Sequence, residues 1–152
     1  MKITDLLPEN TIKIGLPAKT KKEVLSIMLQ IAANSGNIKN YNNARRQLAE
    51  REKLCTTAIG NGIALPHTKS NEIISMAASF AILRNPIPFD AADNKPVNIV
   101  LLLLSNENNV GRQLRYLSIF SNFFANSDNI ANILNCKTEI EILDILSQCE
   151  EE

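Results

Sequence analysis

The chain has 152 residues, a length that fits one domain around a single hydrophobic core. Its 16 basic and 16 acidic side chains cancel, which argues against nucleic-acid binding because no basic excess can neutralise phosphates. A hydrophobic fraction of 45% excludes global disorder, and the longest apolar run, residues 99–104, is too short to cross a bilayer. Asp5 and Pro8 precede any run of signal-peptide length. We therefore expect one soluble, cytoplasmic domain over residues 1–152, without membrane insertion.

Cysteine and histidine usage argues against a bound metal. Cys55, Cys136 and Cys149 are odd in number and show no CxxC spacing, so neither a disulfide framework nor a structural zinc site is expected. His67 is the single histidine, which argues against a metal centre built from several imidazoles. We predict reduced cysteines, no metal and no cofactor.

The N-terminal part of the chain predicts a strand followed by two helices. Residues 11–16 alternate in polarity as a short strand does. Thr20 and Glu23 have capping-box spacing, so a helix is expected from there to about Gly36. Its expected apolar stripe comprises Val24, Leu25, Ile27, Met28, Ile31 and Ala32. A second helix is predicted over about 42–53, where good helix formers cluster.

Two apolar runs in the middle of the chain predict buried strands. Residues 76–83 and 97–104 are short and bounded by turn chemistry, as in strands that are covered on both faces. Prolines and the sequence Asp-Asn-Lys-Pro at 93–96 predict a loop between them.

The C-terminal part predicts three helices. One begins near residue 109, a short one follows Ser127, and Thr138 with Glu141 has the capping-box spacing for the last. The expected apolar face of the first comprises Val110, Leu114, Leu117, Phe120 and Phe124. Strands interleaved with helices predict an α/β fold, a mixed β-sheet covered by helices.

Residues 51–67 carry the chemistry and read REKLCTTAIGNGIALPH. His67 has no metal partners, and its neutral nitrogen is a competent nucleophile near neutral pH. The guanidinium of Arg51 and backbone N–H groups are suited to stabilise phosphoryl charge. The residues expected to form a phosphoryl-binding loop are Thr56, Gly60 and Gly62, with Thr57 beside them.

Each residue of this segment also has a plainer interpretation. A lone histidine is commonly a surface or structural residue. Gly60-Asn61-Gly62 alone signals a turn, and Arg51 in a run of charged residues is by default on a solvated helix face. Only the joint pattern favours phosphoryl chemistry.

That joint pattern resembles the active-site signature of enzyme IIA domains of the bacterial sugar phosphotransferase system, of the fructose, mannitol and nitrogen-related type. The matching residues, in order and spacing, are Arg51-Glu52, Thr56-Thr57 and Gly60-Asn61-Gly62-Ile63-Ala64-Leu65-Pro66-His67. The resemblance implies a single domain whose mixed sheet has helices on both faces, with His67 in an exposed, shallow site.

The resemblance also implies a mechanism and partners. A histidine phosphocarrier protein would transfer a phosphoryl group in line to His67, at Nε2. Arg51 would pair with the phosphoryl oxygens, and Thr57 would donate a hydrogen bond near the imidazole. The group would then pass to a IIB domain or remain as a regulatory mark recognised by protein targets. Positioning and electrostatics carry such a transfer.

One departure from the family concerns Gln113, which stands where many members have a second histidine. Glutamine can donate a hydrogen bond to a phosphoryl oxygen but cannot become cationic. Arg112 is a candidate for the missing positive charge. Two other functions therefore stay open beside the phosphocarrier: a regulatory module that controls kinases, transporters or transcription factors, and a domain that binds without being phosphorylated.

Overall fold

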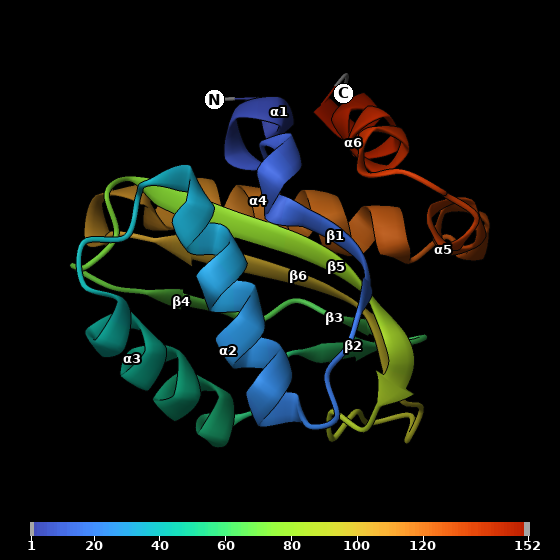
Figure 1. Cartoon of the computed structure of the whole chain (residues 1–152), viewed down its shortest axis with the longest axis horizontal. Helices are drawn as coiled ribbons and strands as arrows, with labels where there is room; N and C mark the ends of the chain where they lie inside the picture. Colours follow the sequence, from blue (N-terminus) through green and yellow to red (C-terminus); the bar gives the residue numbers. More distant parts are fainter. Residues whose placement is uncertain (1, 151–152) are drawn as a thin grey trace.

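A computed structural model describes residues 2–150, with side chains to Cys149, as helices packed around one sheet (Figure 1). The α-helices are α1 (Ile3–Leu6), α2 (Lys21–Ala32), α3 (Tyr41–Leu54), α4 (Val110–Phe124), α5 (Ser127–Leu134) and α6 (Glu139–Ser147). The strands are β1 (Ile12–Leu16), β2 (Ala58–Gly60), β3 (Ile63–Ala64), β4 (His67–Lys69), β5 (Met76–Ile87) and β6 (Val97–Ser105). Short 3-10 turns cover Glu9–Thr11, Ala33–Ser35, Glu107–Asn109 and Gln148–Glu150.

The sheet is mixed and open, as predicted. Its order is β1-β5-β6-β3-β2, and β4 pairs with β6 beyond the end of β3. β5 and β6 run antiparallel along most of their length, whereas β1 is parallel to β5, and both β3 and β4 are parallel to β6. β6 is therefore the strand on which the segment around His67 is built.

Each face of the sheet carries its own hydrophobic core, and helices cover both. On one face α2 and α3 contribute Val24, Met28 and Leu48 to a core with alternate residues of β5 and β6. On the other face α1, α4, α5 and α6 pack against the intervening residues, among them Phe80 and Leu101 (Figure 1). The covering of both faces explains the continuous apolar runs at 76–83 and 97–104, because none of the residues in these runs is exposed.

Local signals in the sequence set where the helices begin. The Thr20 hydroxyl accepts the Glu23 N–H at 3.1 Å, and the Thr138 hydroxyl accepts the Glu141 N–H at 3.2 Å. Gly36 follows the 3-10 turn after α2 with φ of 77°, a left-handed conformation that glycine adopts without steric cost. None of the helices described is both long and apolar enough to cross a membrane.

Two expectations about the elements were wrong. β5 continues to Ile87, beyond residue 83, so it includes Pro86, which was expected in the loop between the two buried strands. Phe120 and Phe124 lie on the buried face of α4 as expected, but Gln113 and Tyr116 complete that face, whereas Leu114 is exposed. The helix is rotated because Gln113 finds two backbone acceptors below it, which makes a polar residue acceptable on the inner face.

Candidate active site

His67 is the first residue of β4, where Cα pairing joins it to Leu103 of β6. The half-buried imidazole points Nδ1 at the carbonyl oxygen of Leu65, 2.8 Å away. A carbonyl can only accept a hydrogen bond, so Nδ1 carries the proton of the neutral ring. The lone pair is then on Nε2, and this nitrogen is the nucleophile that the ring offers.

The backbone before His67 is fixed from both sides. The Leu65 N–H donates to the carbonyl of Thr57 at 3.0 Å, and the Leu103 N–H donates to the carbonyl of Pro66 at 2.9 Å. The ring of Pro66 further restricts the conformation of Leu65. The carbonyl that orients the imidazole is therefore itself held in place.

A hollow of about 570 Å³ lies beside the imidazole. It is formed between α3, β4 and the first turn of α4, and its lining residues are Gln47, Glu50, Arg51, Leu54, His67, Thr68, Lys69 and Gln113. Arg51 and Lys69 bring two positive charges, and Glu50 brings one negative charge. Such a surface favours a small dianion next to a neutral nucleophile.

Arg51 lies in the last turn of α3 and is half-buried. Its Nη1 donates to the carbonyl oxygen of Cys55 at 3.3 Å, which also covers the open end of the helix. The guanidinium therefore has a defined place on the wall of the hollow. The structure brings it and His67 to one site.

Gln113 is also at this site, but both of its N–H groups are already engaged. The side chain is 5% exposed, and its Nε2 donates to the carbonyl of Thr68 at 2.9 Å and to that of Leu103 at 3.1 Å. In this arrangement it has no free N–H for a phosphoryl oxygen. It connects α4 to β4 and β6, and so fixes the strand that carries His67. Arg112 is exposed and does not line the hollow.

The Thr57 side chain donates to a partner other than the imidazole. Its side chain is buried, and its hydroxyl donates to Oε1 of Glu52 while its N–H donates to Oε2 at 3.0 Å. Because a hydroxyl has a single hydrogen, the one on Thr57 is used by Glu52.

The residues expected to form a phosphoryl-binding loop are not brought to His67. The Thr56 hydroxyl donates to the carbonyl of Phe89 at 2.5 Å and accepts the Ala58 N–H at 3.1 Å. Gly60 and Gly62 lie in the turn between β2 and β3. Pairing places β3 at Ile99–Val100 of β6 and His67 at Leu103, so about 13 Å of strand separates the turn from the imidazole. The glycines are required there by conformation, since Gly60, Asn61 and Gly62 all have positive φ.

The side chain of Asp93 stabilises this glycine turn by hydrogen bonds. Its carboxylate accepts the N–H of Asn61 at 2.9 Å and that of Lys95 at 3.1 Å. These two backbone donors lower the pKa of Asp93 below its ordinary value of 3.8. The turn is thus part of the architecture of the sheet edge.

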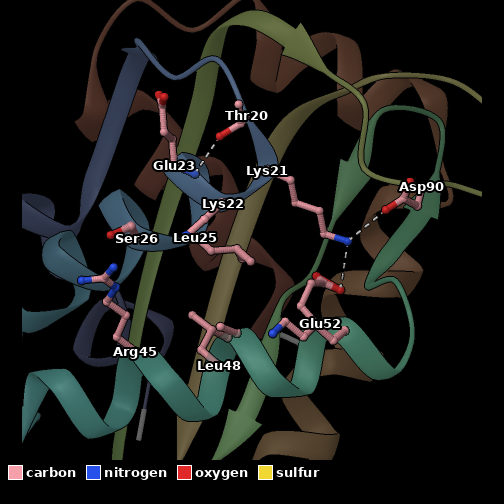
Figure 2. Close-up of a pocket in the computed structure, with 12 residues that line it drawn as sticks. Thr20, Lys21, Lys22, Glu23, Leu25, Ser26, Arg45, Leu48, Glu52 and Asp90 are labelled. Carbon is pink, nitrogen blue, oxygen red and sulfur yellow. Dashed lines mark hydrogen bonds and ion pairs between the residues drawn. The ribbon is translucent and has the colours of Figure 1, made fainter.

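A second, larger hollow of about 850 Å³ lies between α2 and α3 (Figure 2). The ammonium group of Lys21 points between Glu52 and Asp90, at 3.5 Å from a carboxylate oxygen of each. Leu25 and Leu48 form an apolar part of the wall. Glu52 therefore faces this hollow on one side and the loop of Thr57 on the other.

Two residues of the site, Lys69 and Glu52, were given no role of their own in the sequence analysis. Lys69 follows His67 by two positions on a strand, so both point to the same face, and this spacing was a usable signal. Glu52 occupies the apolar stripe of α3 that begins with Ala44 and Leu48, which are both buried. A carboxylate at such a position must have partners, so the pattern itself indicated a polar network. Over the part of the chain that the structure describes, no group of three His, Cys, Asp or Glu residues is placed to hold a metal.

The chain matches known proteins over most of its length. Residues 5–149 match the family model "Phosphoenolpyruvate-dependent sugar phosphotransferase system, EIIA 2". A nitrogen regulatory protein of Bradyrhizobium diazoefficiens is 34% identical over 84% of this chain and 83% of its own length. The fructose-specific EIIABC component of Bacillus subtilis is 28% identical over 97% of this chain, which spans only 23% of that longer protein.

Solved structures show the same fold. The nitrogen regulatory protein IIA-Ntr of Neisseria meningitidis superposes with a TM-score of 0.89 at 27% identity, covering 95% of this chain and 98% of the other. The mannitol IIA enzyme of Escherichia coli, solved in complex with phosphorylated mannitol IIB, superposes with a TM-score of 0.79 over 93% and 96% of the two chains. At 19% identity, that likeness concerns the fold alone. The chain belongs to the EIIA 2 family of the phosphoenolpyruvate-dependent sugar phosphotransferase system.

Proposed function

We propose that the chain is a phosphocarrier that accepts a phosphoryl group on Nε2 of His67 from a histidine phosphocarrier protein. Membership of the EIIA 2 family supports a role as a phosphotransferase component. The observation that carries the proposal is the 2.8 Å approach of Nδ1 to the Leu65 carbonyl, which leaves Nε2 as the nucleophile.

The transfer conserves charge and protons in a simple way. The lone pair of Nε2 attacks phosphorus as the bond between phosphorus and the donor's histidine nitrogen breaks, and that electron pair returns to the donor ring. The Nδ1 proton of His67 stays in place, so the phosphorylated ring carries positive charge beside the Leu65 carbonyl. No general base is needed, because the attacking nitrogen bears no proton.

Positive charge around the hollow supports the proposed step. Arg51 and Lys69 line the hollow next to the imidazole and are suited to pair with the phosphoryl oxygens. In a loose transition state the charge is spread over these oxygens, so positioned cations lower the barrier. Gln113 contributes by fixing β4, since its N–H groups are engaged by backbone carbonyls.

Two fates of the phosphoryl group fit the relatives. One solved fold neighbour is a mannitol IIA in complex with phosphorylated IIB, which supports transfer to a IIB domain. Relatives named nitrogen regulatory proteins support the alternative, in which the phosphohistidine is a regulatory mark recognised in the cytoplasm by protein targets. Both N–H groups of Gln113 are engaged by backbone carbonyls, so Gln113 offers none to a phosphoryl group that is being passed on. Slow onward transfer favours the regulatory alternative.

The test is an incubation of the chain with phosphoenolpyruvate, enzyme I and a histidine phosphocarrier, followed by intact-mass measurement. We expect an acid-labile gain of one phosphoryl group in the wild type and none in His67→Ala. A gain that persists in His67→Ala would contradict the assignment of the acceptor. No gain with a cognate donor would leave the chain as a binding module on a phosphocarrier fold.

A further inference from the structure

A line of hydrogen bonds connects a buried carboxylate of α3 to the imidazole of His67. The two oxygens of Glu52 accept the hydroxyl and the N–H of Thr57. The carbonyl of Thr57 accepts the N–H of Leu65 at 3.0 Å, and the carbonyl of Leu65 lies 2.8 Å from Nδ1 of His67. Every polar group along this line is paired with the next one.

The carboxylate at the start of the line is buried and has a cation beside it. Glu52 is 7% exposed, and a buried carboxylate is stable only when its oxygens are paired. Lys21 supplies the opposite charge at 3.5 Å, and Figure 2 shows its side chain extended from α2 toward Glu52. The ammonium group also lies 5.0 Å from the ring centroid of Phe89, which helps to hold it there.

We propose that Glu52 and Thr57 are positioning residues for His67, and that Lys21 supports them from the α2–α3 hollow. Glu52 fixes Thr57, and Thr57 fixes Leu65 so that its carbonyl receives the Nδ1 proton. This selects the ring tautomer whose Nε2 is free, and it stabilises the positive charge that the ring gains on phosphorylation. The inference rests on the proposed function for its kinetic consequence, but its effect on the tautomer does not depend on any phosphoryl transfer.

Position along the chain gives Glu52 a second effect. It follows Arg51 directly in the last turn of α3, so the contacts that hold Glu52 also fix the backbone from which the guanidinium extends. One buried carboxylate thus connects the nucleophile and the cation of the site. A residue with a purely structural role would lower stability without altering the tautomer of a distant ring.

The first test is nitrogen-15 NMR of the imidazole in the unphosphorylated chain, which reports the tautomer directly. Wild type is expected to hold the proton on Nδ1. Thr57→Val removes the hydroxyl at nearly constant volume, so we expect the Nε2–H tautomer to become populated. Thr57→Ser retains the hydroxyl and is expected to restore the wild-type spectrum.

The second test measures phosphoryl acceptance from a phosphorylated histidine phosphocarrier in single turnovers. Thr57→Val and Glu52→Gln are expected to lower the rate at saturating donor by about tenfold, as for other residues that orient a reacting group. The donor concentration at half-saturation should stay within about twofold, because neither residue faces the hollow beside His67. Lys21→Met, at the half-buried edge of the network, should lower the rate by about threefold.

Tyr41→Phe is the matched control for these variants. The Tyr41 hydroxyl joins the same two helices through the carbonyl of Ser26 at 3.2 Å, but it is not part of the line to His67. Tyr41→Phe should lower stability and leave both the tautomer and the rate unchanged.

A folded Thr57→Val chain with the wild-type tautomer and rate would overturn the proposal. If that variant does not fold, a wild-type tautomer and rate in Lys21→Met would overturn it. If wild type accepts no phosphoryl group, the proposed function fails while the tautomer still decides the positioning role.

Discussion

The ends and the middle of the segment from Arg51 to His67 have different places in the structure. The ends of the segment meet at the hollow, where Arg51 from α3 and His67 from β4 face the same space. The middle forms the turn of Gly60 to Gly62, about 13 Å of strand away along β6. Continuity in sequence therefore does not mean proximity in space. We propose that the ends carry the chemistry, whereas the glycines shape the sheet edge.

The largest expected effect is on the rate of phosphoryl acceptance, when Arg51 at the end of α3 is replaced. Arg51→Met removes a cation that lines the hollow, so we expect the rate of phosphoryl acceptance to fall by about 100-fold, the size typical of losing one positioned charge-stabilising donor. Single-turnover rates with a phosphorylated carrier measure it. Arg46→Met is the control, since Arg46 is exposed on the same helix and bonds only Asn43 among the contacts described. Equal rates for the two variants would contradict the role of Arg51.

The glycine turn is expected to affect stability and not chemistry. A residue with a side chain at position 62 would have to keep the backbone φ of +83°. Its Cβ would lie 2.8 Å from Oδ1 of Asn98. Gly62→Ala should therefore lower the free energy of unfolding by about 2 kcal/mol, measured by denaturant titration. Gly15→Ala has a similar φ of +76° with open space around it, so its cost should be about 1 kcal/mol.

The rate of phosphoryl acceptance in Gly62→Ala tests whether the glycine turn takes part in the chemistry. Because the turn lies away from the hollow, folded Gly62→Ala should accept a phosphoryl group at the wild-type rate. A loss of acceptance in a chain that is fully folded would place the glycine turn in the site after all.

Replacing Gln113 tests how the α4 side of the hollow affects phosphoryl transfer. In its neutral form a histidine there offers one N–H to two carbonyls that now receive one each, so Gln113→His should cost about 1 kcal/mol of stability. Its imidazole can become cationic, and we expect the transfer rate to rise by about tenfold, which is the larger effect. Gln30→His, on the exposed side of α2, controls for the added histidine. A change confined to stability would contradict this expectation.

The smallest expected effect concerns pH and the glycine turn. The pKa of Asp93 is lowered in the folded chain, first by the Asn61 N–H and then by that of Lys95, so its charged form stabilises the fold. This contribution is present above the unfolded value of 3.8 and is lost as the pH falls through the lower folded value. Thermal unfolding of Asp93→Asn should show a lower Tm than wild type at neutral pH, and the difference should shrink below pH 3.8. A difference that is independent of pH would contradict it.

The sequence predicted the elements whose signals are local. The strands β5 and β6 are apolar over most of their length because helices cover both faces, and the threonine caps of α2 and α6 are visible as short motifs. β2, β3 and β4 were not predicted, because strand pairing overrides a local composition typical of loops: β3 and β4 pair with distant β6, and β2 pairs with β3.

The candidate site was predictable only in part for the same reason. The family resemblance pointed to Arg51 and His67, and the structure places both on one hollow. Where Thr57 donates its hydroxyl depended on a carboxylate five residues earlier, and where Gln113 donates depended on two carbonyls of other elements. Hydrogen-bond partners across elements have no signature in local spacing.

Phosphorus-31 NMR of the phosphorylated chain tests the central claim most directly, because it distinguishes the two ring nitrogens. A single phosphohistidine resonance of the Nε2 type, with the Nδ1 proton retained toward Leu65, is the predicted result. A phosphoryl group on Nδ1, or on any residue other than His67, would contradict the account.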